Sequence, residues 1–304
     1  MSDNKMEGNM NHYLQDFLDY LYDQDKSEQT IRAYLADLSA FRRWIEERTE
    51  DPFSPHIITP LDIVNYRRHL QDNKKSPATI NRHIASLSSF CKWSCDMNLI
   101  PTNPIENIKG VSRESIGPKS LERREQLALI RAVQKTGKRR DLAIINLLLH
   151  TGIRVSELCS LRKDDLVIEG RRAMIKISKG KGNKMRYVPL NSTALKSLCS
   201  HIGPPDGSSP SPNDDRHIFH GQKGHPLTER GARHLIKKYA YNAKMAWVSP
   251  HALRHTCAKN LIDAGQPIDR VAKILGHSSI NTTSIYTMPT EADLQHAVES
   301  VSWT

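Results

Sequence analysis

Residues 103–119 separate the chain into two parts with different sequence patterns. This run lacks apolar periodicity and contains four residues that interrupt regular structure: Pro104, Gly110, Gly117 and Pro118. A chain of 304 residues is also longer than one typical domain. We therefore expect two domains joined by a linker, with the boundaries 1–110, 111–120 and 121–304.

The first hundred residues carry the pattern of four amphipathic helices. The second of these places Ile31, Leu38 and Ile45 on one apolar stripe, at the spacing of a helix. The third and fourth begin at Thr59-Pro60 and Ser76-Pro77, where a hydroxyl group can cap the helix and proline fits its first turn. The first domain is therefore expected to be helical.

The second part combines helices with a short hairpin. One helix is expected after Ser120 and another at residues 139–150. Residues 173–178 and 186–190 are rich in β-favouring side chains and flank a Gly-Asn turn, which predicts two antiparallel strands. From Thr228 the pattern is helical again. The expected fold is mainly α, with a mixed α+β second domain that contains a small antiparallel sheet.

Charge is divided unevenly between the two parts. Residues 1–112 hold 13 Lys and Arg against 16 Asp and Glu, whereas residues 113–304 hold 31 against 17. A field this positive favours a polyanionic partner, because Lys and Arg neutralise phosphates and release counterions. A basic protein without such a partner has the same composition, so charge alone leaves both interpretations open.

The composition also indicates a compartment. No run approaches the ~18 apolar residues that span a bilayer, and the polar N-terminus carries no apolar signal segment. The five cysteines form an odd and scattered set, which indicates free thiols in a reducing environment. We expect a cytoplasmic protein with no membrane partner.

Five short motifs of the second part carry phosphate-binding or nucleophilic side chains. They are TGIRVSEL, GKGNK, HALRH, LGH and the tyrosine of SIYT, which contribute Arg154, Lys181, His251, Arg254, His277 and Tyr286. Each motif alone has an ordinary alternative, such as a surface charge, a solvated hairpin tip or a core tyrosine. Together they supply donors for the charge that develops on a reacting phosphodiester, including arginines that bind two oxygens at once. The set favours phosphoryl transfer.

One alternative within these motifs is a metal site. His251 and His255 are four residues apart, which is the spacing of a helical zinc pair. There is no intervening Glu and no third ligand nearby in the sequence, so we expect no metal and read His255 as a structural neighbour.

In this order, the motifs resemble those of the tyrosine recombinases (the phage integrase family), most closely the Xer-type and transposon-resolution members. The family pattern is Arg, Lys on a β-hairpin, His-x-x-Arg, His or Trp, and then Tyr; the chain matches every position, with nine residues from His277 to Tyr286. The resemblance covers nearly the whole chain, although the match in the first domain is helical pattern only. It implies a SAM-like, four-helix core-DNA-binding domain ahead of the catalytic domain.

The resemblance implies a site-specific recombinase that works without a cofactor. Such an enzyme cleaves and religates DNA through a 3′-phosphotyrosyl intermediate, and it exchanges strands between two sites through a Holliday junction. Tyr286 would be the nucleophile. Because the ordinary pKa of tyrosine is ~10, the phenol needs a base, for which His251 is the candidate.

The resemblance also gives roles to the remaining residues of the pattern. Lys181 would protonate the departing 5′-oxygen, and Arg154, Arg254 and His277 would stabilise the phosphorane. Glu157 lies three residues after Arg154 and would orient its guanidinium group; an acid on the helix surface is the alternative.

The implied partner is double-stranded DNA with an inverted-repeat core site, which suggests a nucleoid-associated protein. The second and fourth helices are expected to expose six side chains toward DNA, although a solvated face would have the same composition: Arg32, Arg42, Arg43, Arg82, His83 and Lys92. A helix expected at Glu291–Val301 would dock on the adjacent subunit of a homotetramer. A second recombinase or accessory proteins are further candidate partners.

Two other functions fit parts of the pattern. A type IB topoisomerase-like enzyme uses the same chemistry to relax DNA without exchanging partners, but the helical clamp and the terminal helix favour a recombinase. A non-catalytic DNA-binding protein is expected to carry a degraded motif, and none of the six positions is degraded.

Overall fold

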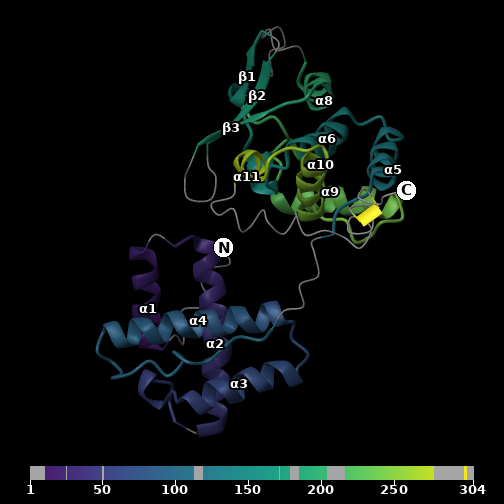
Figure 1. The fold of residues 1–304 in the computed structure, drawn as a ribbon. Helices are drawn as coiled ribbons and strands as arrows, with labels where there is room; N and C mark the ends of the chain where they lie inside the picture. The colour runs from purple at the N-terminus through teal and green to yellow at the C-terminus, as the bar shows by residue number, and fades with distance from the viewer. Residues whose placement is uncertain are drawn as a thin grey trace. The chain divides into compact units, whose positions relative to one another are not determined.

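A computed structural model describes residues 11–24, 26–49, 51–112, 119–170, 172–178, 185–203, 216–276 and 298–299. The chain forms two compact units, residues 1–115 and 116–304 (Figure 1). Each unit has its own core of buried apolar side chains.

The described part of the first unit is helical, as the sequence predicts. Its elements are α1 (His12–Asp23), α2 (Glu28–Thr49), the short 3-10 helix η2 (Pro55–Ile57), α3 (Pro60–Asp72) and α4 (Pro77–Asp96). Helix α2 packs against each of α1, α3 and α4. It contributes the predicted stripe, with Ile31, Leu38 and Ile45 buried.

Local sequence determines where these helices begin. The hydroxyl of Thr59 accepts a hydrogen bond from the backbone N–H of Asp62, whose carboxylate accepts one from the backbone of Thr59. Ser76 caps α4 with its hydroxyl, which accepts a hydrogen bond from the backbone N–H of Thr79. Both predicted starts are confirmed, because each cap satisfies a backbone donor that the first turn leaves without a partner.

Part of the run between the two sequence patterns packs on the first unit. Ile105 is buried in its core. Asn81 of α4 donates to the carbonyl of Val111 at 2.9 Å and accepts from its N–H at 2.7 Å. Arg67 of α3 donates to the carbonyl of Lys109 at 2.7 Å. Residues 103–112 are therefore an ordered extension of the first unit, although they lack apolar periodicity.

The second unit is built around one buried helix. Its helices are α5 (Arg123–Gln134), α6 (Arg139–Thr151), α7 (Val155–Ser160), the 3-10 helix η3 (Lys163–Asp165), α8 (Ser192–Ile202), α9 (Glu229–Asn242), α10 (Pro250–Asp263) and α11 (Ile268–Leu275). Every residue of α6 from Ala143 to Leu149 is buried. This helix packs against α5, α8 and α10, so its surroundings are protein on most sides.

A three-stranded antiparallel sheet lies beside these helices, in the order β1 (Leu166–Glu169), β2 (Arg172–Ile177) and β3 (Arg186–Pro189) (Figure 1). Ala173, Ile175 and Ile177 alternate toward the core. The predicted hairpin is confirmed as β2 and β3, whereas β1 was not predicted. The expected fold class, mainly α with a small antiparallel sheet, is confirmed. Among the described helices, none has the length and apolarity that crossing a membrane requires.

Candidate active site

The first element of the site is the corner between α6 and α7. Helix α6 ends at Gly152, which adopts φ of 61°, in the left-handed region. This turn brings the chain directly to Arg154, the residue that precedes α7. Ile153 between them is buried and anchors the corner in the core. Arg154 is thereby fixed at its backbone while its guanidinium group remains partly exposed.

The second element is the start of α10. Ser249 caps this helix through the N–H of Ala252, and Pro250 occupies the first turn. His251 is exposed, whereas Arg254, one turn further along, is only 6% exposed. A buried guanidinium must find acceptors. Arg254 donates to the carbonyl of Gly152 at 2.6 Å and to that of Leu275 at 2.7 Å.

The end of α11 joins these elements. Three consecutive carbonyl oxygens, those of Ile274, Leu275 and Gly276, each accept from a different guanidinium group. The donors are Arg186 at 3.3 Å, Arg254 at 2.7 Å and Arg154 at 3.1 Å, in that order. The last carbonyls of a helix have no partner within it and carry partial negative charge. The arrangement therefore gathers three arginines at one helix end.

Glu157 on α7 holds two of these arginines. Its Oε1 accepts from Arg154 Nη1 at 3.0 Å and from Arg186 Nη1 at 2.9 Å. Its Oε2 accepts from Arg186 Nη2 at 2.8 Å and from the backbone N–H of Arg154 at 2.8 Å. Glu157 is 2% exposed, so it is not an acid on the helix surface.

The protonation of Glu157 follows from these contacts. Burial raises the pKa of its carboxyl group, but the hydrogen bonds from Arg186 and Arg154 outweigh burial and hold the pKa below its ordinary value. Glu157 is therefore a carboxylate at neutral pH.

A glycine makes the close approach at the end of α11 possible. Gly276 adopts φ of 67°, and a Cβ atom there would lie 2.7 Å from the Arg186 Cζ. Any other residue would displace this guanidinium group and strain the backbone. Gly276 thus explains part of the LGH motif in structural terms.

The structure brings together Arg154, Arg254 and Glu157, and it places His251 one turn from Arg254 on α10. Lys181, His277 and Tyr286 lie outside the described residues. The expected helix at 291–301 lies outside them too, apart from residues 298–299. The site thus contains both predicted catalytic arginines, the candidate base and the predicted accessory acid.

Arg186 was not predicted as a site residue. The sequence places it on a hairpin strand, where an arginine is ordinarily a solvated charge. Its partners are 29 residues away at Glu157 and 88 residues away at Ile274, so no local pattern reveals them. The available signal was its position shortly after the GKGNK motif.

His255, the neighbour of His251, is half-buried. Burial lowers the pKa of its imidazole, and the charges of His251 and Arg254 lower it further. Within the described ranges, no three His, Cys, Asp or Glu side chains lie together in a way that could hold a metal ion.

In the first unit, one of the six predicted DNA contacts is not exposed. His83 is 8% exposed, and its ring nitrogens lie 3.2 Å from Asp37 Oδ1 and 3.1 Å from the hydroxyl of Tyr66. The exposure expected for His83 is therefore wrong, because the helix face that carries it packs on α2 and α3. Burial lowers the pKa of this imidazole, which Asp37 partly counteracts.

Arg82 is half-exposed and reaches the same buried carboxylate, with Nη1 at 2.6 Å from Asp37 Oδ2. The hydroxyl of Ser86 also donates to Asp37, at 2.9 Å. The other predicted contacts are exposed or partly exposed on α2 and α4: Arg32, Arg42, Arg43 and Lys92.

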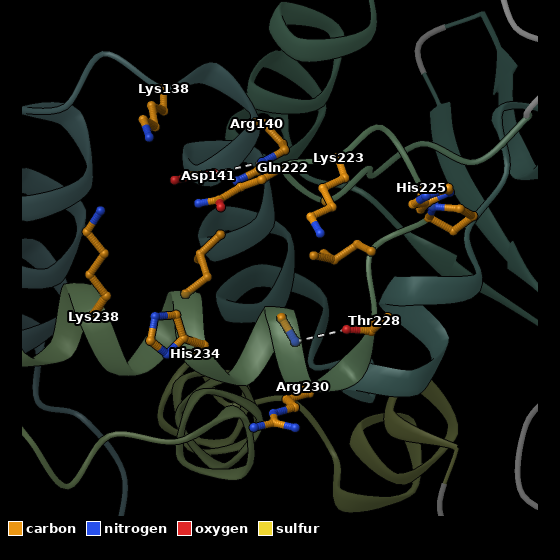
Figure 2. Close-up of a pocket in the computed structure, with 15 residues that line it drawn as sticks. Lys138, Arg140, Asp141, Gln222, Lys223, His225, Thr228, Arg230, His234 and Lys238 are labelled. Atoms are coloured by element: carbon orange, nitrogen blue, oxygen red, sulfur yellow. Dashed lines mark hydrogen bonds and ion pairs between the residues drawn. The ribbon is translucent and has the colours of Figure 1, made fainter. Parts of the chain in front are cut away.

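A basic pocket of about 630 Å³ lies elsewhere in the second unit, among α6, α9 and residues 221–228. Five cationic side chains line it: Lys138, Arg140, Lys223, Arg230 and Lys238. Figure 2 shows Lys138 and Lys238 approaching it from two sides. Asp141, the acid that lines it, is bound by Arg140 at 2.7 Å and by the hydroxyl of Tyr239 at 2.6 Å. None of the predicted catalytic residues lines this pocket.

Comparison with known families gives two matches that together cover most of the chain. Residues 119–293 match the Phage integrase family, and residues 14–97 match the Phage integrase, N-terminal SAM-like domain. The first match includes the described arginines of the site and the motifs at positions 181, 277 and 286.

Individual proteins agree with these matches. The chain is 33% identical to the tyrosine recombinase XerC of Listeria innocua, over 92% of this chain and 93% of the relative. It is 30% identical to the XerC of Thermodesulfovibrio yellowstonii, over 96% of this chain and 95% of that relative. The fold is similar to a crystal structure of the XerH site-specific recombinase bound to palindromic difH substrate, with a TM-score of 0.74. The two sequences are 21% identical, and the match covers 94% of this chain and 83% of the XerH chain.

Proposed function

Because the chain belongs to the phage integrase family, we propose that the arginine cluster at the end of α11 is the phosphate-binding centre of a site-specific DNA recombinase. The protein is an enzyme of the tyrosine recombinase type, which breaks and rejoins DNA through a covalent intermediate. The residues that carry out each step are our proposal.

The observation that carries it is the convergence of Arg154 and Arg254. They come from positions one hundred residues apart and bind adjacent carbonyls, those of Gly276 and Leu275. Each guanidinium group has five N–H donors in a planar fork. Two guanidinium groups held together at one helix end favour the binding of the non-bridging oxygens of one phosphodiester, where negative charge grows as the phosphorus becomes pentacoordinate.

The proposed chemistry needs neither a metal ion nor a nucleotide. The phenolic oxygen of Tyr286 attacks a DNA phosphorus and gives up its proton, for which His251 is the candidate acceptor. The bond from phosphorus to the 5′-oxygen breaks, and Lys181 supplies the proton that makes this oxygen a hydroxyl. His277 adds a further donor to the phosphate. The phosphotyrosyl ester conserves the energy of the cleaved phosphodiester bond. A 5′-hydroxyl from the partner strand can therefore attack it, release Tyr286 and rejoin the DNA.

DNA binding is proposed to involve both units. Exposed side chains of α2 and α4, with Arg82 held by Asp37, would contact the duplex from the first unit. In the second unit, the basic pocket lined by Lys138 and Lys238 offers concentrated positive charge for backbone phosphates. The DNA is proposed to carry an inverted-repeat core site.

Assembly is proposed to follow the family pattern. Four copies would bind two sites, with residues 291–301 of each copy docking on the next. A second recombinase or accessory proteins could complete the complex. Removing the residues after Met288 is expected to abolish recombination and to spare specific DNA binding; unchanged recombination would contradict this assembly.

The central experiment uses a nicked suicide DNA substrate containing a selected binding site. The wild-type protein is expected to form a covalent protein–DNA adduct, and Tyr286→Phe is expected to form none. A plasmid with two sites then reports strand exchange. No adduct from the wild-type protein, or an equal adduct from Tyr286→Phe, would overturn the proposal.

A further inference from the structure

Arg186 begins β3 and links three elements of the second unit. Its Nη1 and Nη2 bind the two carboxylate oxygens of Glu157 on α7, at 2.9 and 2.8 Å. Its Nε donates to the carbonyl of Ile274 on α11 at 3.3 Å. The side chain is only 13% exposed. A bidentate, largely buried arginine fixes the relative positions of its partners more firmly than an exposed pair does.

The charges of this cluster do not cancel. One buried carboxylate, Glu157, is shared by Arg154 and Arg186, so these three side chains together carry one net positive charge. Arg186 makes the bidentate pair, while Arg154 contributes a single side-chain hydrogen bond to Glu157. Arg186 is therefore the principal counterion of the carboxylate, and the charge of Arg154 remains available for an incoming anion.

Without Arg186, the charge balance around Glu157 changes. Glu157 would have only Arg154 as its counterion, and the pair would be neutral overall. The guanidinium of Arg154 would also be drawn toward the carboxylate and away from the carbonyl of Gly276. Both effects weaken the attraction between Arg154 and a phosphate oxygen.

We propose that Arg186 is a positioning residue: it neutralises Glu157 and fixes the end of α11, so that Arg154 can bind the reacting phosphate. This role rests on the proposed function, since it requires Arg154 to bind DNA phosphate. It is distinct from general structural support, because it depends on the charge balance with Glu157.

The test compares four variants with the wild-type protein. Arg186→Met removes the charge, Arg186→Lys keeps the charge without the fork, and Arg186→Met combined with Glu157→Gln removes both charges. Arg172→Met is the control, because Arg172 is exposed on the neighbouring strand β2. Folding is checked by circular dichroism. DNA affinity and the single-turnover rate of adduct formation are measured separately, the rate at saturating suicide DNA.

Arg186→Met is expected to lower the cleavage rate about 100-fold, a typical effect of a misplaced catalytic group, and to leave DNA affinity within about threefold. Arg186→Lys is expected to lower the cleavage rate roughly tenfold. The double variant is expected to cleave DNA at least about tenfold faster than Arg186→Met, because removing the carboxylate restores the net positive charge beside the phosphate. Arg172→Met is expected to match the wild-type protein.

The outcomes separate this inference from the proposed function. If the wild-type protein forms no adduct, the proposed function itself fails. If it does form one, a cleavage rate for Arg186→Met within threefold of the wild-type rate overturns the role of Arg186. A double variant no faster than Arg186→Met overturns the charge argument. If Arg186→Met does not fold, Arg186→Lys serves as the test instead. A wild-type cleavage rate in Arg186→Lys then overturns the inference.

Discussion

Arg254 donates a hydrogen bond of 2.6 Å to the carbonyl oxygen of Gly152, across 102 residues of sequence. This bond ties α10 to the corner that carries Arg154. Gly152 is suited to the corner in two ways: its φ is 61°, and a Cβ atom there would lie 2.5 Å from Leu275 Cδ2. The two proposed phosphate-binding arginines are therefore positioned by one glycine.

Gly152→Ala is expected to destabilise the second unit and to lower the rate of adduct formation. The left-handed backbone and the overlap with Leu275 should together cost roughly 2–4 kcal/mol in the free energy of unfolding. Gly170→Ala is the matched control, because Gly170 has φ of 58° and nothing within 4 Å of the added Cβ. Urea unfolding of both variants separates the backbone cost from the packing cost; equal losses would show that the contact with Leu275 is unimportant.

The stability contributed by Glu157 should depend on pH. Its pKa in the folded protein is below the ordinary 4.5, so its ion pairs stabilise the folded state fully above about pH 4.5. That contribution is lost as pH falls through the lower folded pKa. Glu157→Gln is expected to cost about 3 kcal/mol at neutral pH, since it leaves the largely buried Arg186 and the partly exposed Arg154 without their shared carboxylate.

The difference in unfolding free energy between wild type and Glu157→Gln should be constant between about pH 6 and 8, and should shrink below about pH 4.5. Urea unfolding at several pH values measures it. Glu169→Gln is the control, because Glu169 is exposed on β1 and its replacement should change stability by less than about 0.5 kcal/mol. A difference that persists unchanged in acid would contradict the role of the Glu157 carboxylate.

The elements that could be predicted from the sequence are those with local causes. The starts of α3 and α4 follow from Thr59 and Ser76, whose caps act within three residues. The hairpin of β2 and β3 follows from alternation and a turn. Strand β1 cannot be predicted in this way, because its four residues, Leu166–Glu169, are too few to show a period.

The partners of charged side chains are less predictable, because they are distant in sequence. His83 and Arg82 are neighbours on α4, and the helix pattern predicts that both are exposed. Their actual partner, Asp37, lies on α2, and burial of that carboxylate draws His83 inward. The partners of Arg186 are likewise distant in sequence, at Glu157 and Ile274. The order of the motifs predicts Arg154 and Arg254 as site residues, but no local pattern indicates that they share the end of α11.

Asp37→Asn should test the buried network of the first unit. Asp37 is 2% exposed and binds Arg82, His83 and Ser86. Losing its charge is expected to cost about 3 kcal/mol in the unfolding free energy of this unit. It should also weaken DNA binding, because Arg82 loses the contact that orders it. Asp16→Asn on the exposed face of α1 is the control. A destabilised variant with wild-type DNA affinity would show that the contact with Asp37 does not prepare Arg82 for DNA binding.

The basic pocket can be tested through the salt dependence of DNA binding. Each phosphate contact by a lysine releases counterions, and removing one such contact reduces the slope of log K against log salt by about one. Lys138→Met combined with Lys238→Met is therefore expected to reduce this slope by about two and to weaken binding to all DNA sequences similarly. Fluorescence anisotropy at several salt concentrations measures both effects.

The matched control replaces two exposed lysines outside the pocket, with Lys163→Met and Lys196→Met together. This pair has the same change in net charge, so a general electrostatic effect would lower affinity equally in both double variants. Direct contact predicts a larger change in slope for Lys138 and Lys238 than for the control pair. If the two double variants show the same slope, the pocket does not bind backbone phosphates, and its charge acts only through the overall field of the second unit.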